Sequence, residues 1–525
     1  MSRLYTLFAL PFAASLAAAQ TPCDQLKLSF PDARIESIEF VPAGPFAAPK
    51  GTLTPVIPGP ASAAGKQAAK GRGPVGPAAA VPAYCRILMV MTPSSDSLID
   101  TAVFLPTENW NGKLQVVGNG GWAGSVSYPA MAAALREGYA VASNDTGHRA
   151  NDAGGGGMFA LGHPEKITDF AYRAMHETVV KAKLITVAFY GKGPKYSYYN
   201  GCSTGGRQGL IEIRKFPEDF DAASVGAPAN PHVHLHAAGV ERSLQLMKNN
   251  APLTQAKVET LHKAVMDSCD ALDGVKDGII GNPEKCHYDP SALLCRGGDE
   301  ERCLTAPQVE AVKMGYVPAR RKTGELIYPG LVPGGETGWA MLTGANPEPG
   351  AIDVGMFRYV GHQNPAWDWR TFDLEADTAL IDKRASFIDA INPDLSAFKA
   401  RGGKLLIYHG WNDGGSGGAI SPQNSVNYYS SVVTRMGPRP EGWLRLFMVP
   451  GMAHCGGGPG PNQIDWLAAL ERWRESGMAP DQIIAARVAD GRVDMTRPLC
   501  PYPQVAHYKG VGTANDSGNF VCKAP

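Results

Sequence analysis

One serine in the sequence has a setting that could make it a nucleophile. Ser203 lies at the centre of Gly201-Cys202-Ser203-Thr204-Gly205, between a strand-like run at residues 196–199 and an apolar run with helical spacing at 208–213. A strand, a G-x-S-x-G turn and a helix are the context of a nucleophile elbow. Flanking glycines allow strand and helix to pack closely around the serine, which then lies beside the free N–H groups of the helix start. The alternative is an ordinary serine in a glycine-rich loop.

Two residues far along the chain could complete the chemistry. Asp413 comes just after an apolar run at residues 404–410, and His454 comes just after another at 443–450. Both are therefore expected beyond the C-terminal ends of strands. The order Ser, Asp, His is that of the α/β-hydrolases. In such a triad the histidine removes the serine proton and the carboxylate orients the histidine, so Ser203, Asp413 and His454 are predicted to be catalytic.

A glycine-rich stretch could stabilise the negative charge that such a reaction develops. Gly118-Asn119-Gly120-Gly121-Trp122-Ala123-Gly124 follows a predicted strand at residues 114–117. Hydrolases of this kind build the oxyanion hole from one N–H of such a loop and from the N–H of the residue after the nucleophile. We therefore predict Gly121 and Thr204 as the donors, with Gly120 as the alternative to Gly121. A flexible turn without this role is the other interpretation.

The remaining patterns indicate how these residues are positioned. A predicted helix at 130–138 separates the buried strands predicted at 114–117 and 139–143, which is a βαβ unit of a parallel sheet. Sheet signals stop after about residue 230 and resume near 404, so the intervening segment is interpreted as a lid. The predicted fold is α/β, an α/β-hydrolase with a mostly parallel sheet flanked by helices. Its parts are a first core segment at 20–230, an inserted lid domain at 231–395 and a second core segment at 396–525.

Composition excludes some classes of partner and favours export. The 525 residues contain 49 Lys+Arg and 49 Asp+Glu, so there is no excess positive charge to attract nucleic acid or an anionic membrane. Residues 1–19 have the pattern of a signal peptide, with an apolar segment followed by small residues. We therefore expect a secreted or periplasmic protein. Residues 41–82 are rich in Pro, Ala and Gly and are predicted to form an extended loop.

The cysteines also suit an exported protein. Ten are present, an even number that suggests five disulfides, although spacing alone does not determine the pairing. Eight of them fall into local groups, which leaves Cys202 and Cys455 beside Ser203 and His454. The local groups are Cys23 with Cys85, Cys269 with Cys286, Cys295 with Cys303, and Cys500 with Cys522 in the C-terminal tail.

An acidic stretch in the predicted lid could hold a cation. Residues 267–279 contain four aspartates and one lysine, together with glycines that permit tight turns. Such crowding of negative charge is unfavourable unless it is neutralised, and hard oxygen ligands suit Ca²⁺. The spacing is not that of an EF-hand, and a solvated acidic turn is the alternative. The predicted ligands are Asp270, Asp273 and Asp277 with the carbonyl oxygens of Val275 and Ile279.

Taken together, these motifs resemble the tannase and feruloyl esterase family of α/β-hydrolases over nearly the whole mature length. The resemblance is carried by the serine motif, the acidic lid loop, and the runs at residues 364–369, 409–413 and 451–455. It implies a Ser203–His454–Asp413 triad, a disulfide between Cys202 and Cys455, and a structural calcium ion in the lid. The acid loop departs from the family pattern, because residues 414–418 lengthen it with glycines.

The resemblance further implies a substrate class, namely small-molecule or polysaccharide-linked esters of phenolic acids. A feruloyl esterase acting on plant cell-wall hydroxycinnamates is the preferred prediction, and a tannase or a hydrolase of other aromatic monoesters is the alternative. Two non-enzymatic alternatives are a calcium-dependent carbohydrate-binding protein and a structural or adhesion protein. His148 and His409 are predicted to be structural. Four lid aromatics could line the substrate pocket or simply pack: Trp339, Phe357, Trp367 and Trp369. The sequence does not determine the oligomeric state.

Overall fold

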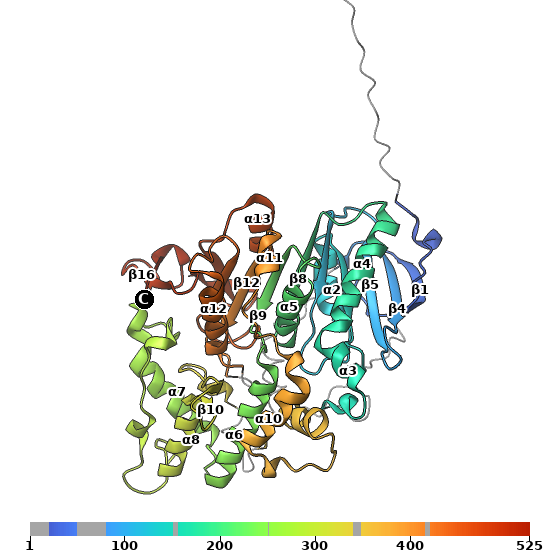
Figure 1. Ribbon diagram of the computed structural model, residues 1–525. Helices are drawn as coiled ribbons and strands as arrows, with labels where there is room; N and C mark the ends of the chain where they lie inside the picture. The colour runs from blue at the N-terminus through green and yellow to red at the C-terminus, as the bar shows by residue number, and fades with distance from the viewer. Residues whose placement is uncertain (1–19, 50–79, 151–155, 250, 340–347, 415–419) are drawn as a thin grey trace, which may run out of the picture.

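A nine-stranded sheet forms the centre of the protein (Figure 1). The computed structural model describes residues 20–49, 80–150, 156–249, 251–339, 348–414 and 420–525. The strand order is β1-β4-β5-β7-β6-β8-β9-β12-β13; neighbours are parallel from β7 to β13 and antiparallel from β1 to β7. This is the predicted mostly parallel sheet. Its strands are β1 (Ala33–Val41), β4 (Tyr84–Met91), β5 (Ile99–Pro106), β6 (Lys113–Val117), β7 (Ala140–Asn144), β8 (Tyr196–Cys202), β9 (Ala222–Gly226), β12 (Lys404–Gly410) and β13 (Leu444–Val449).

Helices cover both faces of this sheet. One face packs against α4 (Ala174–Tyr190), α5 (Thr204–Lys215) and α12 (Pro422–Met436), and the other packs against α2 (Tyr128–Arg136) and α13 (Trp466–Ser476). Because both faces are covered, the sequences of the central strands are continuous apolar runs and do not alternate between apolar and polar residues. The predicted βαβ unit is confirmed as β6, α2 and β7.

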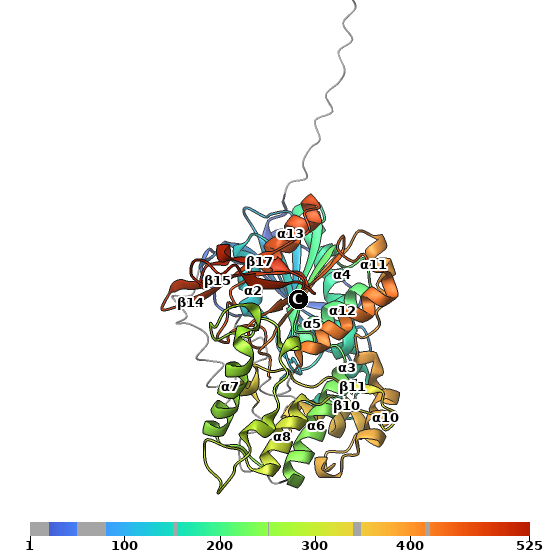
Figure 2. The same cartoon turned by 90° about the vertical axis from the view of Figure 1, so that its left-hand side faces the viewer.

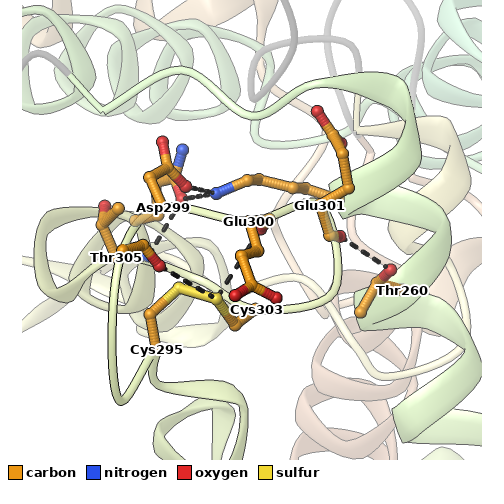
Figure 3. Close-up of a disulfide and its surroundings, with 10 residues drawn as sticks. Thr260, Cys295, Asp299, Glu300, Glu301, Cys303 and Thr305 are labelled. Atoms are coloured by element: carbon orange, nitrogen blue, oxygen red, sulfur yellow. Dashed lines mark hydrogen bonds and ion pairs between the residues drawn. A yellow bond between two sulfur atoms is a disulfide. The ribbon is translucent and has the colours of Figure 1, made fainter.

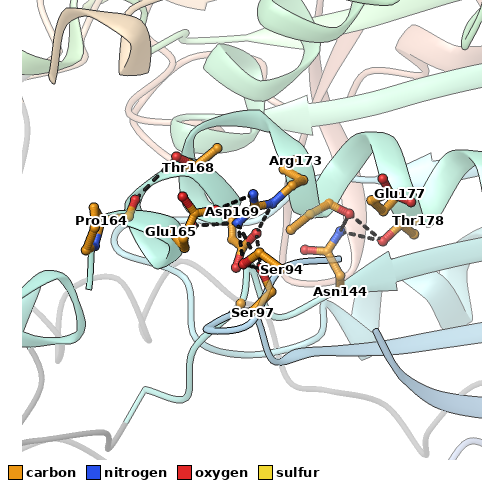
Figure 4. A network of polar contacts seen from close by, with 12 residues as sticks. Ser94, Ser97, Asn144, Pro164, Glu165, Thr168, Asp169, Arg173, Glu177 and Thr178 are labelled. Atoms are coloured by element: carbon orange, nitrogen blue, oxygen red, sulfur yellow. Dashed lines mark hydrogen bonds and ion pairs between the residues drawn. The ribbon is translucent and has the colours of Figure 1, made fainter. Parts of the chain in front are cut away.

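The long helix that leads to β8 contains one irregular turn. A π-helical turn, Asp169–Arg173, follows directly on the short helix that ends at Thr168 and continues as α4. Figure 4 shows the polar network at this turn, in which Arg173 Nε donates to Asp169 Oδ1 at 2.5 Å. Nearby, buried Asn144 donates to Thr178 Oγ1 at 2.9 Å and thus ties β7 to α4. Short helices α3 (Pro164–Thr168) and α11 (Ser396–Ala400) complete this part of the core.

The described residues between β9 and β12 add no strand to the main sheet, and they form a helical layer below it in Figures 1 and 2. Two disulfides, Cys269–Cys286 and Cys295–Cys303, cross-link this lid. Figure 3 shows the second of them, beside a hydrogen bond of 3.1 Å from Thr260 Oγ1 to the Glu301 carbonyl oxygen. The lid elements are α6 (His232–Asn249), α7 (Gln255–Cys269), α8 (Ala306–Tyr316), β10 (Ala319–Arg320), β11 (Leu326–Tyr328), α9 (Ala351–Gly355) and α10 (Leu374–Ala385).

Disulfides also fasten the two ends of the described chain. Cys23–Cys85 ties the N-terminal segment to β4, next to the edge strand β1. Cys500–Cys522 closes the C-terminal tail, as its grouping in the sequence suggested. The tail contains the hairpins β14 (Ile483–Ala489) with β15 (Arg492–Leu499) and β16 (Val505–Tyr508) with β17 (Phe520–Lys523). The predicted signal peptide at 1–19 lies outside the described residues. So does most of the predicted 41–82 loop, of which β2 (Gly44–Pro45) and β3 (Ala80–Val81) are described.

The strand order determines where a site can form. From β6 the chain crosses to β7 on one side, whereas β8 pairs with β6 on the other side. Ligands of open α/β sheets bind at such switch points, beyond the carboxyl ends of the strands. Val117 at the end of β6 pairs with Asn200 near the end of β8, so the glycine-rich loop and the serine turn emerge side by side.

A buried arginine fastens the lid to the core. Arg207 on α5 is fully buried and donates to three carbonyl oxygens, those of Phe170 and Ala171 in the π-helical turn and that of Ile388 at the end of the lid. Burial lowers the pKa of Arg207 to about 10, so the side chain remains a cation at neutral pH. Charged donors to buried carbonyl groups are stronger than neutral ones.

We predict that Arg207→Leu destabilises the protein by about 2–3 kcal/mol, because it leaves three buried carbonyl groups without their charged donor. Chemical denaturation should measure the change. Arg214→Leu, on the exposed side of the same helix, is the matched control and should change stability by about 0.5 kcal/mol or less. Equal stability of the two variants would contradict this role for Arg207.

Candidate active site

The turn around Ser203 has the strained geometry of a nucleophile elbow. Ser203 has a φ of 65° and directly precedes α5, with its N–H bonded to the Gly226 carbonyl oxygen at 2.9 Å. A non-glycine residue with positive φ costs free energy that the surrounding structure must offset. The flanking glycines are required for space: a Cβ on Gly201 would lie 2.8 Å from the backbone of Gly205, and one on Gly205 would lie 2.8 Å from Asn119 O.

A disulfide brings the histidine loop to this turn. Cys202 and Cys455 are bonded, with their Cα atoms 6.0 Å apart, across a sequence separation of 253 residues. The bond joins the residue before Ser203 to the residue after His454, as the resemblance implied. A loop of this length gives about 5 kcal/mol of stabilisation in the chain-entropy model.

His454 is bonded to the carboxylate of Asp413. His454 Nδ1 lies 2.6 Å from Asp413 Oδ2, and 36% of the His454 side chain is exposed, whereas none of the Asp413 side chain is. Burial alone would raise the pKa of Asp413, but the charge of His454 and hydrogen bonds from His409 and His454 outweigh it and lower the pKa to about 2. For His454, burial opposes the charged form, yet Asp413 raises its pKa above the ordinary 6.5. The pair is therefore arranged to stabilise an imidazolium.

The proton positions follow from this contact. Because Asp413 is ionised it only accepts, so His454 Nδ1 carries the proton and Nε2 holds the lone pair of the neutral ring. No hydrogen bond from Ser203 Oγ to His454 Nε2 occurs among the described residues. Catalytic contacts of this kind are often long in unliganded enzymes and shorten when substrate binds. The arrangement can therefore supply a base beside a nucleophile.

The two predicted oxyanion donors lie in contacting loops. Thr204 Oγ1 donates to the Gly121 carbonyl oxygen at 2.8 Å, and Gly121 has a φ of 56° that suits glycine. Within the described part of the chain, no hydrogen bond occupies the N–H of Thr204 or of Gly121. The lid reaches this loop, because a Cβ on Gly121 would lie 3.5 Å from the side chain of Ile352. Two free N–H groups therefore lie next to the nucleophile turn.

Sequence reasoning missed two polar residues at the site. His409 is buried, as expected of a core histidine, but its Nε2 lies 3.0 Å from Asp413 Oδ2 and its Nδ1 lies 2.7 Å from Ser425 Oγ. Its position four residues before Asp413, at a strand end, was the available signal. Ser425 lies on α12 and carried no sequence signal.

The remaining candidates near the predicted pocket are packing residues. His148 is buried and stacks on Phe159 with ring centroids 3.6 Å apart. The four lid aromatics proposed as possible pocket residues are also all buried, with exposed fractions of 8% or less. Trp339 packs against Tyr316 in the cluster around α7 and α8. Residues 415–419 of the lengthened acid loop lie outside the described residues.

The acidic lid loop has the donor chemistry for a divalent cation. The carboxylate of Asp270 accepts from the N–H groups of Asp277, Gly278 and Ile279 at 3.1–3.3 Å, so the loop wraps around it. Burial, with the nearby charges of Asp277 and Asp270, raises the pKa of Asp273 to about 7. Arg497 pairs with Asp277 at 2.5 Å and offsets part of this negative charge. The oxygen-rich donor set with its excess negative charge fits Ca²⁺.

The side-chain oxygens of this loop are not gathered tightly, however. Among the described residues, the group of metal-ligating side chains whose ligand atoms all lie within 4.8 Å of one another is His176, Glu212 and Asp219. His176 Nδ1 is already bonded to Asp219 at 2.7 Å. Burial and the charge of Asp219 raise the pKa of Glu212 well above its usual range. We assign no metal to it.

Known proteins resemble this chain over nearly its whole length. Residues 85–523 match the family described as tannase and feruloyl esterase. An uncharacterized esterase of Xanthomonas campestris pv. campestris is 35% identical over 99% of this chain and 94% of its own. A probable feruloyl esterase B of Aspergillus clavatus is 34% identical over 99% of each chain.

Solved structures agree with this assignment. The crystal structure of feruloyl esterase B from Aspergillus oryzae covers 95% of this chain and 99% of its own at 32% identity, with a TM-score of 0.85. Tannin acyl hydrolase from Aspergillus niger, at 19% identity and a TM-score of 0.74 over 97% of this chain and 94% of its own, shares the fold. No helix among the described residues is long and apolar enough to cross a membrane. The chain belongs to the tannase and feruloyl esterase family, and it is a carboxylic ester hydrolase.

Proposed function

We propose that the protein is an exported feruloyl esterase that cleaves hydroxycinnamate esters through a Ser203–His454–Asp413 triad. The observation that carries the triad is the 2.6 Å contact from His454 to buried Asp413, together with the disulfide that joins the histidine loop to the serine turn. Relatives about one-third identical over nearly the whole chain carry the name feruloyl esterase B, which favours ferulate over gallate as the acyl group. Five disulfides support export.

The reaction proceeds by acyl transfer to water. His454 Nε2 removes the Ser203 proton as the serine oxygen attacks the ester carbonyl, and Asp413 stabilises the imidazolium that forms. The N–H groups of Thr204 and Gly121 donate to the oxyanion, which is worth about 3 kcal/mol per donor. The imidazolium then protonates the leaving alcohol. Water repeats the attack on the acyl-enzyme with His454 again as base, and the phenolic acid is released.

We propose in addition that the acidic lid loop binds Ca²⁺. Asp270, Asp273 and Asp277, with the carbonyl oxygens of Val275 and Ile279, would hold it, and the ion would neutralise the clustered carboxylates. The role is structural, because these residues belong to the lid and none of the catalytic steps above uses them.

Tannase activity is the alternative substrate assignment.

Initial rates on methyl ferulate and methyl gallate test the substrate. We expect clear preference for ferulate, and we expect Ser203→Ala to lower kcat by about 10⁴-fold or more while its thermal unfolding stays close to wild type. Preference for gallate would make the protein a tannase. Full activity of Ser203→Ala on either ester would contradict the triad.

Removing the Cys202–Cys455 disulfide should affect catalysis more than removal of another bridge does. We expect Cys202→Ser/Cys455→Ser to lower kcat on the order of a hundredfold, because the base is no longer fixed against the nucleophile turn. The matched control, Cys295→Ser/Cys303→Ser, breaks a lid bridge across a separation of 8 residues and should retain kcat. Similar kcat in the two double variants would argue against a positioning role for the site disulfide.

Removal of calcium should lower thermal stability. A chelator is expected to reduce the melting temperature by about 5–10 °C, and added Ca²⁺ should restore it. Asp273→Asn should have a low melting temperature that Ca²⁺ does not change. Asp267→Asn alters an exposed carboxylate paired with Lys263 at 2.5 Å and should respond to Ca²⁺ as wild type does. A wild-type melting temperature indifferent to both reagents would rule out the ion.

A further inference from the structure

His409 extends the line of hydrogen bonds behind the proposed triad. The imidazole is fully buried near the end of β12 and contacts two polar groups from different elements. Its Nε2 lies 3.0 Å from Asp413 Oδ2, and its Nδ1 lies 2.7 Å from Ser425 Oγ on α12. Ser425 is fully buried as well. The contacts run in one chain from α12 through β12 to Asp413 and then to His454.

The ionised Asp413 carboxylate determines which nitrogen of His409 must carry a hydrogen. Ionised Asp413 can only accept, so the His409 nitrogen that faces it, Nε2, carries a hydrogen. In a neutral His409 ring, Nδ1 would then be an acceptor, and the Ser425 hydroxyl would donate to it. In that state, the contact with Ser425 would favour the tautomer of His409 that donates to Asp413. A carboxylate in place of Ser425 would instead favour a charged ring.

Both donors reach the same oxygen of Asp413. His454 and His409 bond to Oδ2, whereas buried Oδ1 has no hydrogen-bond partner among the described residues. The orientation of the carboxylate is thus set at Oδ2 alone. If His409 did not hold that oxygen, the carboxylate could rotate about its Cβ–Cγ bond and present Oδ1, which would loosen the contact with His454.

We propose that His409 and Ser425 are positioning residues that hold Asp413 Oδ2 against His454. The proposal rests on the catalytic roles given above to Ser203, His454 and Asp413. Neither positioning residue exchanges a proton with substrate. Their effect reaches the reaction through Asp413, as that of groups that orient catalytic ligands generally does.

The other ionisable groups near Asp413 do not replace this arrangement. Tyr328 on β11 is fully buried, and burial together with the charge of Asp413 raises its pKa, so it stays neutral. Its hydroxyl oxygen accepts the N–H of Ser421 at 3.0 Å. Arg242 and Asp353 from the lid act on Tyr328. His454 and His409 therefore remain the donors to the Asp413 carboxylate among the described groups.

The test compares three variants of the residues that hydrogen-bond behind Asp413 with one control variant elsewhere in the protein. His409→Phe removes the donor, His409→Gln keeps an amide donor near the Nε2 position, and Ser425→Ala removes only the group that selects the tautomer. His234→Gln is the matched control, because His234 also bonds to a carboxylate, Asp382 at 2.8 Å, but in the lid. kcat and KM are measured against pH with p-nitrophenyl acetate and with methyl ferulate, and thermal unfolding reports on folding.

Loss of the donor should reduce kcat and move the pH profile. We expect His409→Phe to lower kcat about 10–100-fold, with KM changed about twofold or less. Asp413 raises the pKa of His454, so a loosened contact lets that pKa fall, and the acidic limb of kcat/KM moves to lower pH. Ser425→Ala should show a smaller change in the same direction, and His409→Gln should recover most of kcat. If His409 had a merely structural role, its replacement would lower the fraction of active enzyme equally at every pH.

The proposal is overturned if folded His409→Phe keeps the kcat and the acidic limb of wild type. If that variant does not fold, Ser425→Ala provides the test. A wild-type kcat and a wild-type pH profile in Ser425→Ala would also overturn the proposal. The activated ester separates this result from the substrate assignment. Failure on methyl ferulate with activity on p-nitrophenyl acetate would reject the feruloyl substrate and leave the test of His409 intact.

Discussion

The covalent bond between Cys202 and Cys455 is the constraint on which the candidate site most depends. It joins the last residue of β8 to a loop after β13, and these two strands are separated in the sheet by β9 and β12. Adjacent strands are spaced by about 4.8 Å, so the two loops would otherwise start well apart. The bond closes this distance at the place where the proposed base must face the proposed nucleophile.

Electrostatic interactions around Asp413 also stabilise the candidate site. The Asp413 carboxylate is buried, where an isolated charge would be strongly unfavourable. Two imidazoles donate to its Oδ2 and hold its pKa to about 2. A carboxylate that stays ionised throughout the neutral range can stabilise the imidazolium at every stage of the reaction. Burial of the carboxylate lowers the dielectric constant around Asp413 and thereby strengthens its contacts with the imidazoles.

The lid takes part in the site from the side opposite the sheet. Arg207 fastens its end to α5 through the Ile388 carbonyl group, and Asn412 beside Asp413 donates to the Gly334 carbonyl oxygen at 2.7 Å. Ile352 approaches the Gly121 loop. Core and lid are therefore connected at α5, at the loop of Asp413 and at the proposed oxyanion loop. Movement of the lid would act on all three.

The sequence by itself determined the local features of this protein. Strand runs, the glycine-flanked Ser203 turn and the order of Ser203, Asp413 and His454 were readable because they depend on neighbours in the chain, and the parallel sheet followed from the βαβ pattern. Only the tertiary structure decided which groups meet. The residues around Asp169 give no local sign of a π-helical turn, whose Phe170 and Ala171 carbonyl groups accept hydrogen bonds from Arg207 on α5. His409 looked like an ordinary core histidine, because it lies on strand β12 whereas its partner Ser425 lies on helix α12. Such contacts join residues whose spacing in sequence carries no periodic signal, so packing alone creates them.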